Sequence, residues 1–182
     1  MLCNLIITYL SYFDLTMCIE NIQKCDSYNY LEYSNYIFTI AKASHIYHLI
    51  FFTKLSYDEY LHHVVMCLFC GPLTYYFSNT RMSAATMFFL SGLPGLVDYA
   101  NLYLVKLELL SSYTQKYIYF FINLCIRSPM LLFLSISQLL YNNSQNELEY
   151  TIRTILASTV IWNSQYFLFL TVRDVIRKNI IG

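Results

Sequence analysis

Long apolar runs separated by short polar stretches organise this chain from end to end. A membrane-spanning helix needs about 20 mostly apolar residues, and six runs approach or reach that length. The runs lie at residues 2–19, 36–53, 60–77, 82–107, 117–140 and 152–172. The pattern therefore predicts an all-α, polytopic membrane protein with about six transmembrane helices.

The first run is the most polar of the six, since Asn4 and Asp14 interrupt it. It lacks the basic start and the small-residue cleavage site of a signal peptide. We interpret residues 1–34 as a first span and its following loop, residues 35–172 as the main membrane domain, and residues 173–182 as a basic cytoplasmic tail. No repeat or linker divides the chain, so these parts form one domain.

Two segments predict irregular helices. Gly71-Pro72 predicts a kink in the third run, because proline has no N–H to donate and its ring clashes with the preceding turn. The sequence Ser-Gly-Leu-Pro-Gly at residues 91–95 predicts that the fourth run bends or unwinds.

Composition supports the membrane class and excludes others. The chain has 182 residues, of which 57% are hydrophobic and only 12% are charged, whereas soluble domains carry about 25% charged residues. The net charge is zero, so no basic surface favours a nucleic-acid partner. Six scattered cysteines do not resemble the disulfide framework of a small secreted domain. Basic residues near the span ends are more numerous on the side that holds both termini, which predicts cytoplasmic termini.

Several ionisable residues fall inside the predicted spans, where a charge at the helix centre costs about 2.5–3.5 kcal/mol. Such residues normally face the bundle interior and pair with one another. Asp98 shares a face with Asn101, and Asn123 lies one turn before Arg127. We expect Asp98 and Arg127 to pair across the fourth and fifth helices. The full set of intramembrane ionisable residues is Lys42, His45, His48, His62, His63, Asp98 and Arg127.

The adjacent His62 and His63 carry the sharpest chemical signal. Neighbouring side chains on a helix point about 100° apart, so one imidazole can face a cavity while the other bonds to a neighbouring helix. A neutral imidazole can act as base or nucleophile, which suits acyl transfer from a thioester. A carboxylate such as Asp98 would orient the ring. Histidines that only hydrogen-bond between helices remain an alternative.

Three segments together resemble the TLC family of multi-pass membrane proteins, which includes translocating-chain-associating proteins and ceramide synthases. They are Asp58-x-x-x-His62-His63, the stretch Gly-Leu-Pro-Gly-Leu-Val-Asp that ends at Asp98, and Asn-Leu-Cys-Ile-Arg-Ser-Pro from Asn123. The likeness covers residues 35–172. It implies a compact, barrel-like bundle around a central cavity, in the endoplasmic reticulum or another internal membrane (a host membrane if the source is viral).

The resemblance also implies an active site. In ceramide synthases, tandem histidines and downstream aspartates form the acyl-transfer site, and His62, His63 and Asp98 match that pattern. The implied co-substrate is acyl-CoA, and the implied partners are membrane lipids and long acyl chains, with no bound cofactor or metal. Where the synthases carry a further His-Asp pair, this chain has Pro94 and Gly95. Supporting intramembrane polar residues are His45, His48, Asn101, Asn123 and Arg127.

These observations predict a TLC-like protein of lipid metabolism, sensing or trafficking. Whether it is an enzyme is left open; a catalytic chain would be a ceramide-synthase-like acyltransferase acting on a lipid amine or hydroxyl. Two alternatives stay open. One is a metal-dependent lipid enzyme that uses the four histidines, and the other is a small transporter with Lys42, Asp98 and Arg127 along its path. A homodimer is compatible with both.

Overall fold

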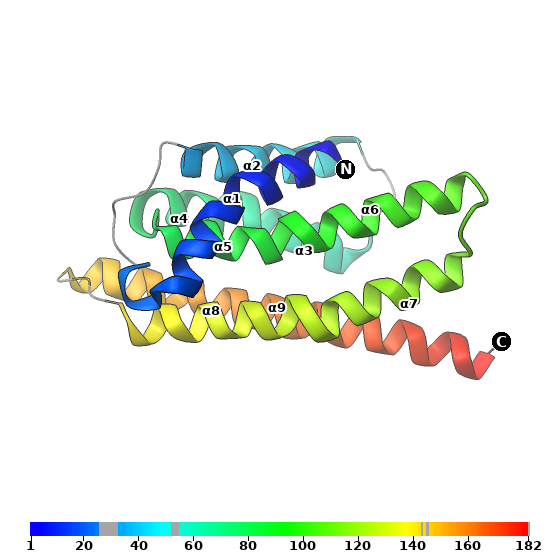
Figure 1. The fold of residues 1–182 in the computed structure, drawn as a ribbon. Coiled ribbons are helices and arrows are strands. Elements are labelled where there is room, and N and C mark those ends of the chain that lie inside the picture. Colours follow the sequence, from blue (N-terminus) through cyan, green and yellow to red (C-terminus); the bar gives the residue numbers. More distant parts are fainter. Residues whose placement is uncertain (26–32, 52–54, 143, 145, 182) are drawn as a thin grey trace.

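The computed structural model describes residues 1–25, 33–51, 55–142, 144 and 146–181, and within them it contains helices but no strand. Figure 1 shows most of the helices lying side by side, with α1 crossing the others obliquely. The α-helices are α1 (Leu2–Glu20), α2 (Tyr33–Phe51), α3 (Tyr57–Val65), α4 (Gly71–Phe77), α5 (Arg81–Met87), α6 (Leu93–Lys106), α7 (Ser112–Ile122), α8 (Ser128–Leu140) and α9 (Glu147–Ile181). A 3₁₀ turn at Ile22–Lys24 follows α1.

Three pairs of these helices are continuous rods joined by a π-helical turn. The turns are Met66–Cys70 between α3 and α4, Phe88–Gly92 between α5 and α6, and Asn123–Arg127 between α7 and α8. A proline stands at the second residue of each following helix, and these are the three prolines of the chain. A proline ring clashes with the carbonyl of the preceding turn, and a widened turn relieves that clash. The sequence predicts that residues 91–95 bend or unwind, and unwinding is wrong, because the helix continues through them. The irregularity is instead the π-helical turn, which ends at Gly92 with a non-helical ψ of -101°.

Each of the six predicted runs falls on a helical rod in the described residues. Among the described residues, four rods are long and apolar enough to cross a membrane: Leu2–Glu20, Arg81–Lys106, Ser112–Leu140 and Glu147–Arg177. The all-helical class and the membrane association are thereby confirmed. Helix ends differ from the prediction, because polar residues extend the rods beyond their apolar centres. Thus α9 continues through most of the predicted tail, while residues 26–32, in the first loop, and residue 182 lie outside the described part.

The distribution of polar and apolar side chains is that of a protein surrounded by lipid. Large apolar side chains such as Leu68, Phe69 and Phe133 are exposed on the outside of the rods. Polar side chains such as Thr80 and Asn163 are fully buried between the rods. A soluble domain rarely exposes large contiguous apolar surface, so this arrangement agrees with the membrane assignment.

The polar residues of α1 tie it to the bundle. The Asn4 amide donates to the carbonyl of Ser91, 2.6 Å away, beside the proline-associated turn. A side chain at Gly95 would occupy the space of that amide, so the close approach needs glycine here. At the other end of α1, the buried Asp14 carboxylate lies 4.0 Å from Arg81. The two residues that interrupt the first apolar run are thus contacts between helices.

Cys18 and Cys25 form a disulfide just beyond these contacts. The Cys25 carbonyl accepts a hydrogen bond from the backbone N–H of Met82 at 3.1 Å, which joins the end of α1 to the start of α5. The other four cysteines are free thiols, namely Cys3, Cys67, Cys70 and Cys125. One crosslink at one end of a helix is not a disulfide framework, in agreement with the sequence.

Candidate functional site: a cluster of four histidines

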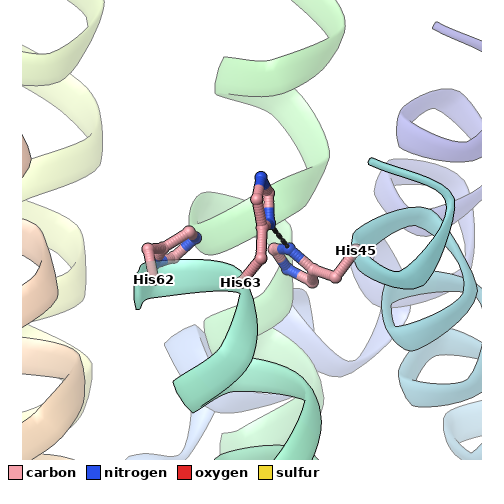
Figure 2. Close-up of side chains that lie close together, drawn as sticks. All are labelled: His45, His62 and His63. Atoms are coloured by element: carbon pink, nitrogen blue, oxygen red, sulfur yellow. Dashed lines mark hydrogen bonds between the residues drawn. The ribbon is translucent and has the colours of Figure 1, made fainter. Parts of the chain in front are cut away.

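All four histidines of the chain gather between α2 and α3, with one contact to α6. The ring centroid of His63 lies 4.9 Å from that of His45, 5.2 Å from that of His48 and 5.3 Å from that of His62. Figure 2 shows His62 and His63 on one helix facing His45 on the other. The two separate pairs that the sequence contains thus form one site.

Local sequence explains where α3 presents its pair. Ser56 caps the helix, with its hydroxyl accepting from the Glu59 backbone N–H at 3.3 Å. The Glu59 carboxylate accepts in return from the Ser56 N–H at 2.8 Å, which completes a capping box. The helix therefore starts at a defined residue. His62 and His63 fall in its last turn, and Val64 and Val65 separate them from the first π-helical turn.

His45 and His63 form a hydrogen bond in which both rings use the same atom type. Their Nδ1 atoms lie 2.6 Å apart, and a dashed line marks the bond in Figure 2. In a neutral pair one Nδ1 must donate and the other must accept. The donating ring then has no proton on Nε2, while the accepting ring carries one there. Whichever ring donates, the pair presents one basic nitrogen.

His62 belongs to a second chain of contacts, which leads into the bundle. Its Nδ1 lies 2.8 Å from Nδ2 of Asn163 on α9. Oδ1 of Asn163 accepts from the Arg127 guanidinium at 3.0 Å, and Asn123 accepts from the same guanidinium at 3.1 Å. The Phe167 ring packs against both His62 and Arg127. Its centroid lies 4.9 Å from the His62 ring centroid and 5.6 Å from the Arg127 carbon Cζ.

A cavity of about 80 Å³ lies inside the bundle beside the cluster, with room for several water-sized groups. His45 lines it, together with apolar side chains such as Phe38, Met87 and Leu90. Ser78 is among the polar groups that line it elsewhere. The sequence predicts that His62 or His63 faces the cavity, whereas His45 from the neighbouring helix lines it.

Asp98 lies apart from the histidine pair that it was expected to orient. Its carboxylate accepts a hydrogen bond from Gln115 at 2.6 Å, and no hydrogen bond or ion pair joins it to His62 or His63, all three being described residues. The expected pair between Asp98 and Arg127 is wrong, because each side chain bonds to an amide instead. The Gln115 amide satisfies Asp98, and the amide oxygens of Asn123 and Asn163 satisfy Arg127.

The other expected polar residues divide in the same way. Asn123 belongs to the chain that ends at His62, whereas Asn101 lies half-buried on α6 and its amide nitrogen has no partner within the described residues. Sequence reasoning missed two contacts. Tyr99 bonds to Nε2 of His48 at 2.9 Å, and Asn163 bonds to His62. An asparagine in the middle of an apolar run was the available signal for Asn163.

Three histidines could also hold a metal ion. His45, His62 and His63 each offer one ring nitrogen, and these atoms all lie within 4.8 Å of one another. Imidazole is a common zinc ligand at about 2.0–2.1 Å. The expected absence of a metal site is therefore not supported by the geometry, although the hydrogen bond at 2.6 Å already uses Nδ1 of two of the rings.

Comparison with protein-family models, with curated proteins and with solved structures found no match to this chain.

Proposed function

We propose that this chain is a TLC-like membrane protein that acts on lipid, and that His45 and His63 form the base for acyl transfer to a lipid amine or hydroxyl. One observation carries the proposal: the cavity-lining His45 is hydrogen-bonded to His63, so a basic imidazole nitrogen is always present in this pair. Mostly apolar walls suit a section of an acyl chain.

The proposed step is a general-base transfer from an acyl thioester. The acceptor N–H or O–H bond breaks as its proton passes to the free Nε2 of the pair. The acceptor atom forms a bond to the thioester carbonyl carbon, and the C–S bond then breaks. The thiolate leaves with the proton that the imidazolium returns, so the pair ends the cycle as it began.

The test is an acyl-transfer assay on detergent-purified protein, with mixed acyl-CoAs and long-chain bases. We expect acylated product from wild type and a loss of roughly 10²–10⁴-fold in His63→Gln, the usual range for a general base. Tyr103→Phe, on the exposed face of α6, is the matched control and should keep full activity. No product from a folded wild-type protein would reject acyl transfer and favour lipid sensing or carriage.

The disulfide supports an orientation. Disulfides form in oxidising compartments, so the end of the bundle with Cys18 and Cys25 would face away from the cytosol. Figure 1 places the C-terminus at the opposite end, which would then be cytosolic. In intact internal-membrane vesicles, an exposed thiol introduced near the C-terminus should react with a membrane-impermeant maleimide. Protection of that thiol until detergent is added would reverse the orientation.

A second function is favoured by the three ring nitrogens within 4.8 Å. In that case His45, His62 and His63 bind a divalent ion, and the chain is a metal-dependent lipid enzyme. Metal analysis of protein purified without chelator distinguishes the two. One zinc per chain, absent from His63→Gln, would establish the metal centre, whereas substoichiometric metal that is equal in both proteins would eliminate it.

A further inference from the structure

The buried amide of Asn163 has a defined orientation, because of what lies on each side of it. Arg127, which is also buried, has only N–H donors. The Asn163 oxygen must therefore face Arg127, as observed at 3.0 Å. Turning the amide over would place its NH₂ group against the guanidinium, with two sets of donors and no acceptor. The Asn163 nitrogen is thus directed at His62.

This orientation determines where His62 carries its proton. The Asn163 NH₂ donates, so Nδ1 of His62 must accept, at the observed 2.8 Å. A neutral imidazole has one donor and one acceptor nitrogen, and the proton therefore lies on Nε2. A doubly protonated ring would place an N–H against the amide N–H. His62 is accordingly a hydrogen-bond donor through Nε2, and in this tautomer Nε2 has no lone pair for a metal ion.

We propose that Arg127 and Asn163 are positioning residues that hold His62 as a fixed hydrogen-bond donor for the carbonyl oxygen of the acyl substrate. The His62 ring centroid lies 5.3 Å from those of both His45 and His63, so this donor stands beside the pair that contains the cavity-lining His45. The His45–His63 pair would then supply the base, and His62 would stabilise the negative charge that develops on that oxygen. No proton is transferred at His62. That the bound oxygen belongs to an acyl substrate rests on the proposed acyl transfer. The tautomer of His62 rests only on its contact with Asn163 and on the contact of Asn163 with Arg127.

Arg127 is a buried arginine whose described contacts include no carboxylate, and the tautomer of His62 explains why its partner is an asparagine. An aspartate in place of Asn163 would pair with Arg127, yet it would accept from His62 and draw the proton to Nδ1. Nε2 would then become a base or a metal ligand. Asparagine satisfies the hydrogen bonding of Arg127 and keeps the opposite tautomer, but it leaves the guanidinium charge without a carboxylate among its described contacts.

Nitrogen-15 NMR of histidine-labelled protein in lipid nanodiscs tests the tautomer without substrate. The chain has four histidines, so the ring-nitrogen spectrum is small, and His62→Gln identifies the signals of His62 by their loss. We expect Nδ1 of His62 to be the unprotonated nitrogen and Nε2 to carry the proton. A proton on Nδ1, or on both nitrogens, would overturn the proposal even if acyl transfer were established.

Asn163→Asp sharpens the test. The proton of His62 should move to Nδ1, and zinc affinity should rise at least tenfold as Nε2 becomes available. Asn101→Asp makes the same chemical change at a residue of α6 that has no hydrogen bond to His62, and it should alter neither signal. An unchanged tautomer in folded Asn163→Asp would contradict the role of Asn163. If that variant does not fold, the wild-type spectrum decides the question. Zinc binding by the wild-type protein that requires His62 would also overturn the proposal, because Nε2 of His62 would then have to be unprotonated.

Discussion

Two of the polar groups that line the cavity differ in chemistry. His45 joins the imidazole cluster. Elsewhere Ser78 and Ser83 line the cavity and share a hydrogen bond at 3.0 Å, while Gln138 donates to Ser78 at 2.8 Å. Both groups are polar networks that join helices distant in the sequence; the serine network is buried and the histidine cluster is half-buried. Of these two groups, only the imidazoles have a basic ring nitrogen that can accept a proton from a substrate.

The difference teaches that burial and polarity do not by themselves indicate a reactive site. The serine network satisfies hydroxyl and amide groups that would otherwise be unpaired, and such pairing stabilises the fold. The histidine cluster also satisfies its hydrogen bonds, yet its protons can occupy alternative nitrogens. Substitutions in the two networks should therefore affect different properties, the rate of reaction in one and the stability of the fold in the other.

The largest effect is expected from the histidine pair. His45→Gln and His63→Gln should each lower acyl-transfer activity by roughly 10²–10⁴-fold, because either change removes the shared base. The double variant should be no slower than the slower single variant, since residues that act as one unit are not additive. Initial rates on folded protein measure this. Independent, multiplying losses would show that the two rings do not work as a pair.

An intermediate effect is expected at the start of α5, beside the serine network. Thr80 caps this helix, and its hydroxyl accepts from the Ser83 N–H at 3.3 Å. Thr80→Ala should lower the free energy of unfolding by about 1 kcal/mol, as for other lost caps. Denaturant unfolding in mixed micelles measures it. Activity per folded molecule should be unchanged. A large loss of rate in Thr80→Ala would show that the serine network also contributes to the reaction.

The smallest effect is expected from Asp98→Asn. The new amide still offers an oxygen to Gln115, and Asp98 has no hydrogen bond to His62 or His63. Activity should remain within about threefold of wild type, which corresponds to under ~1 kcal/mol in the barrier. A loss as large as that of His63→Gln would instead return Asp98 to the catalytic site, as its resemblance to the synthase aspartate implies.

The helical rods were predictable because lipid imposes a strong local rule. In hydrocarbon each backbone polar group must be satisfied within its own segment, so apolar runs such as 82–107 and 117–140 indicate helices directly. Helix ends were less predictable, since polar residues such as those after residue 172 can continue a helix into water. The proline positions were visible in the sequence, but the π-helical turns that accommodate them were not.

The residues of the candidate site could be predicted from the sequence better than the hydrogen bonds between them. The sequence by itself determined an all-helical membrane protein with four histidines in two pairs, since apolar runs and the polar residues within them are local properties. Only the tertiary structure decided that His63 bonds to His45, that Asp98 lies elsewhere, and that Asn163 bonds to His62. These contacts depend on how the helices rotate and cross, which is decided by packing over the whole bundle.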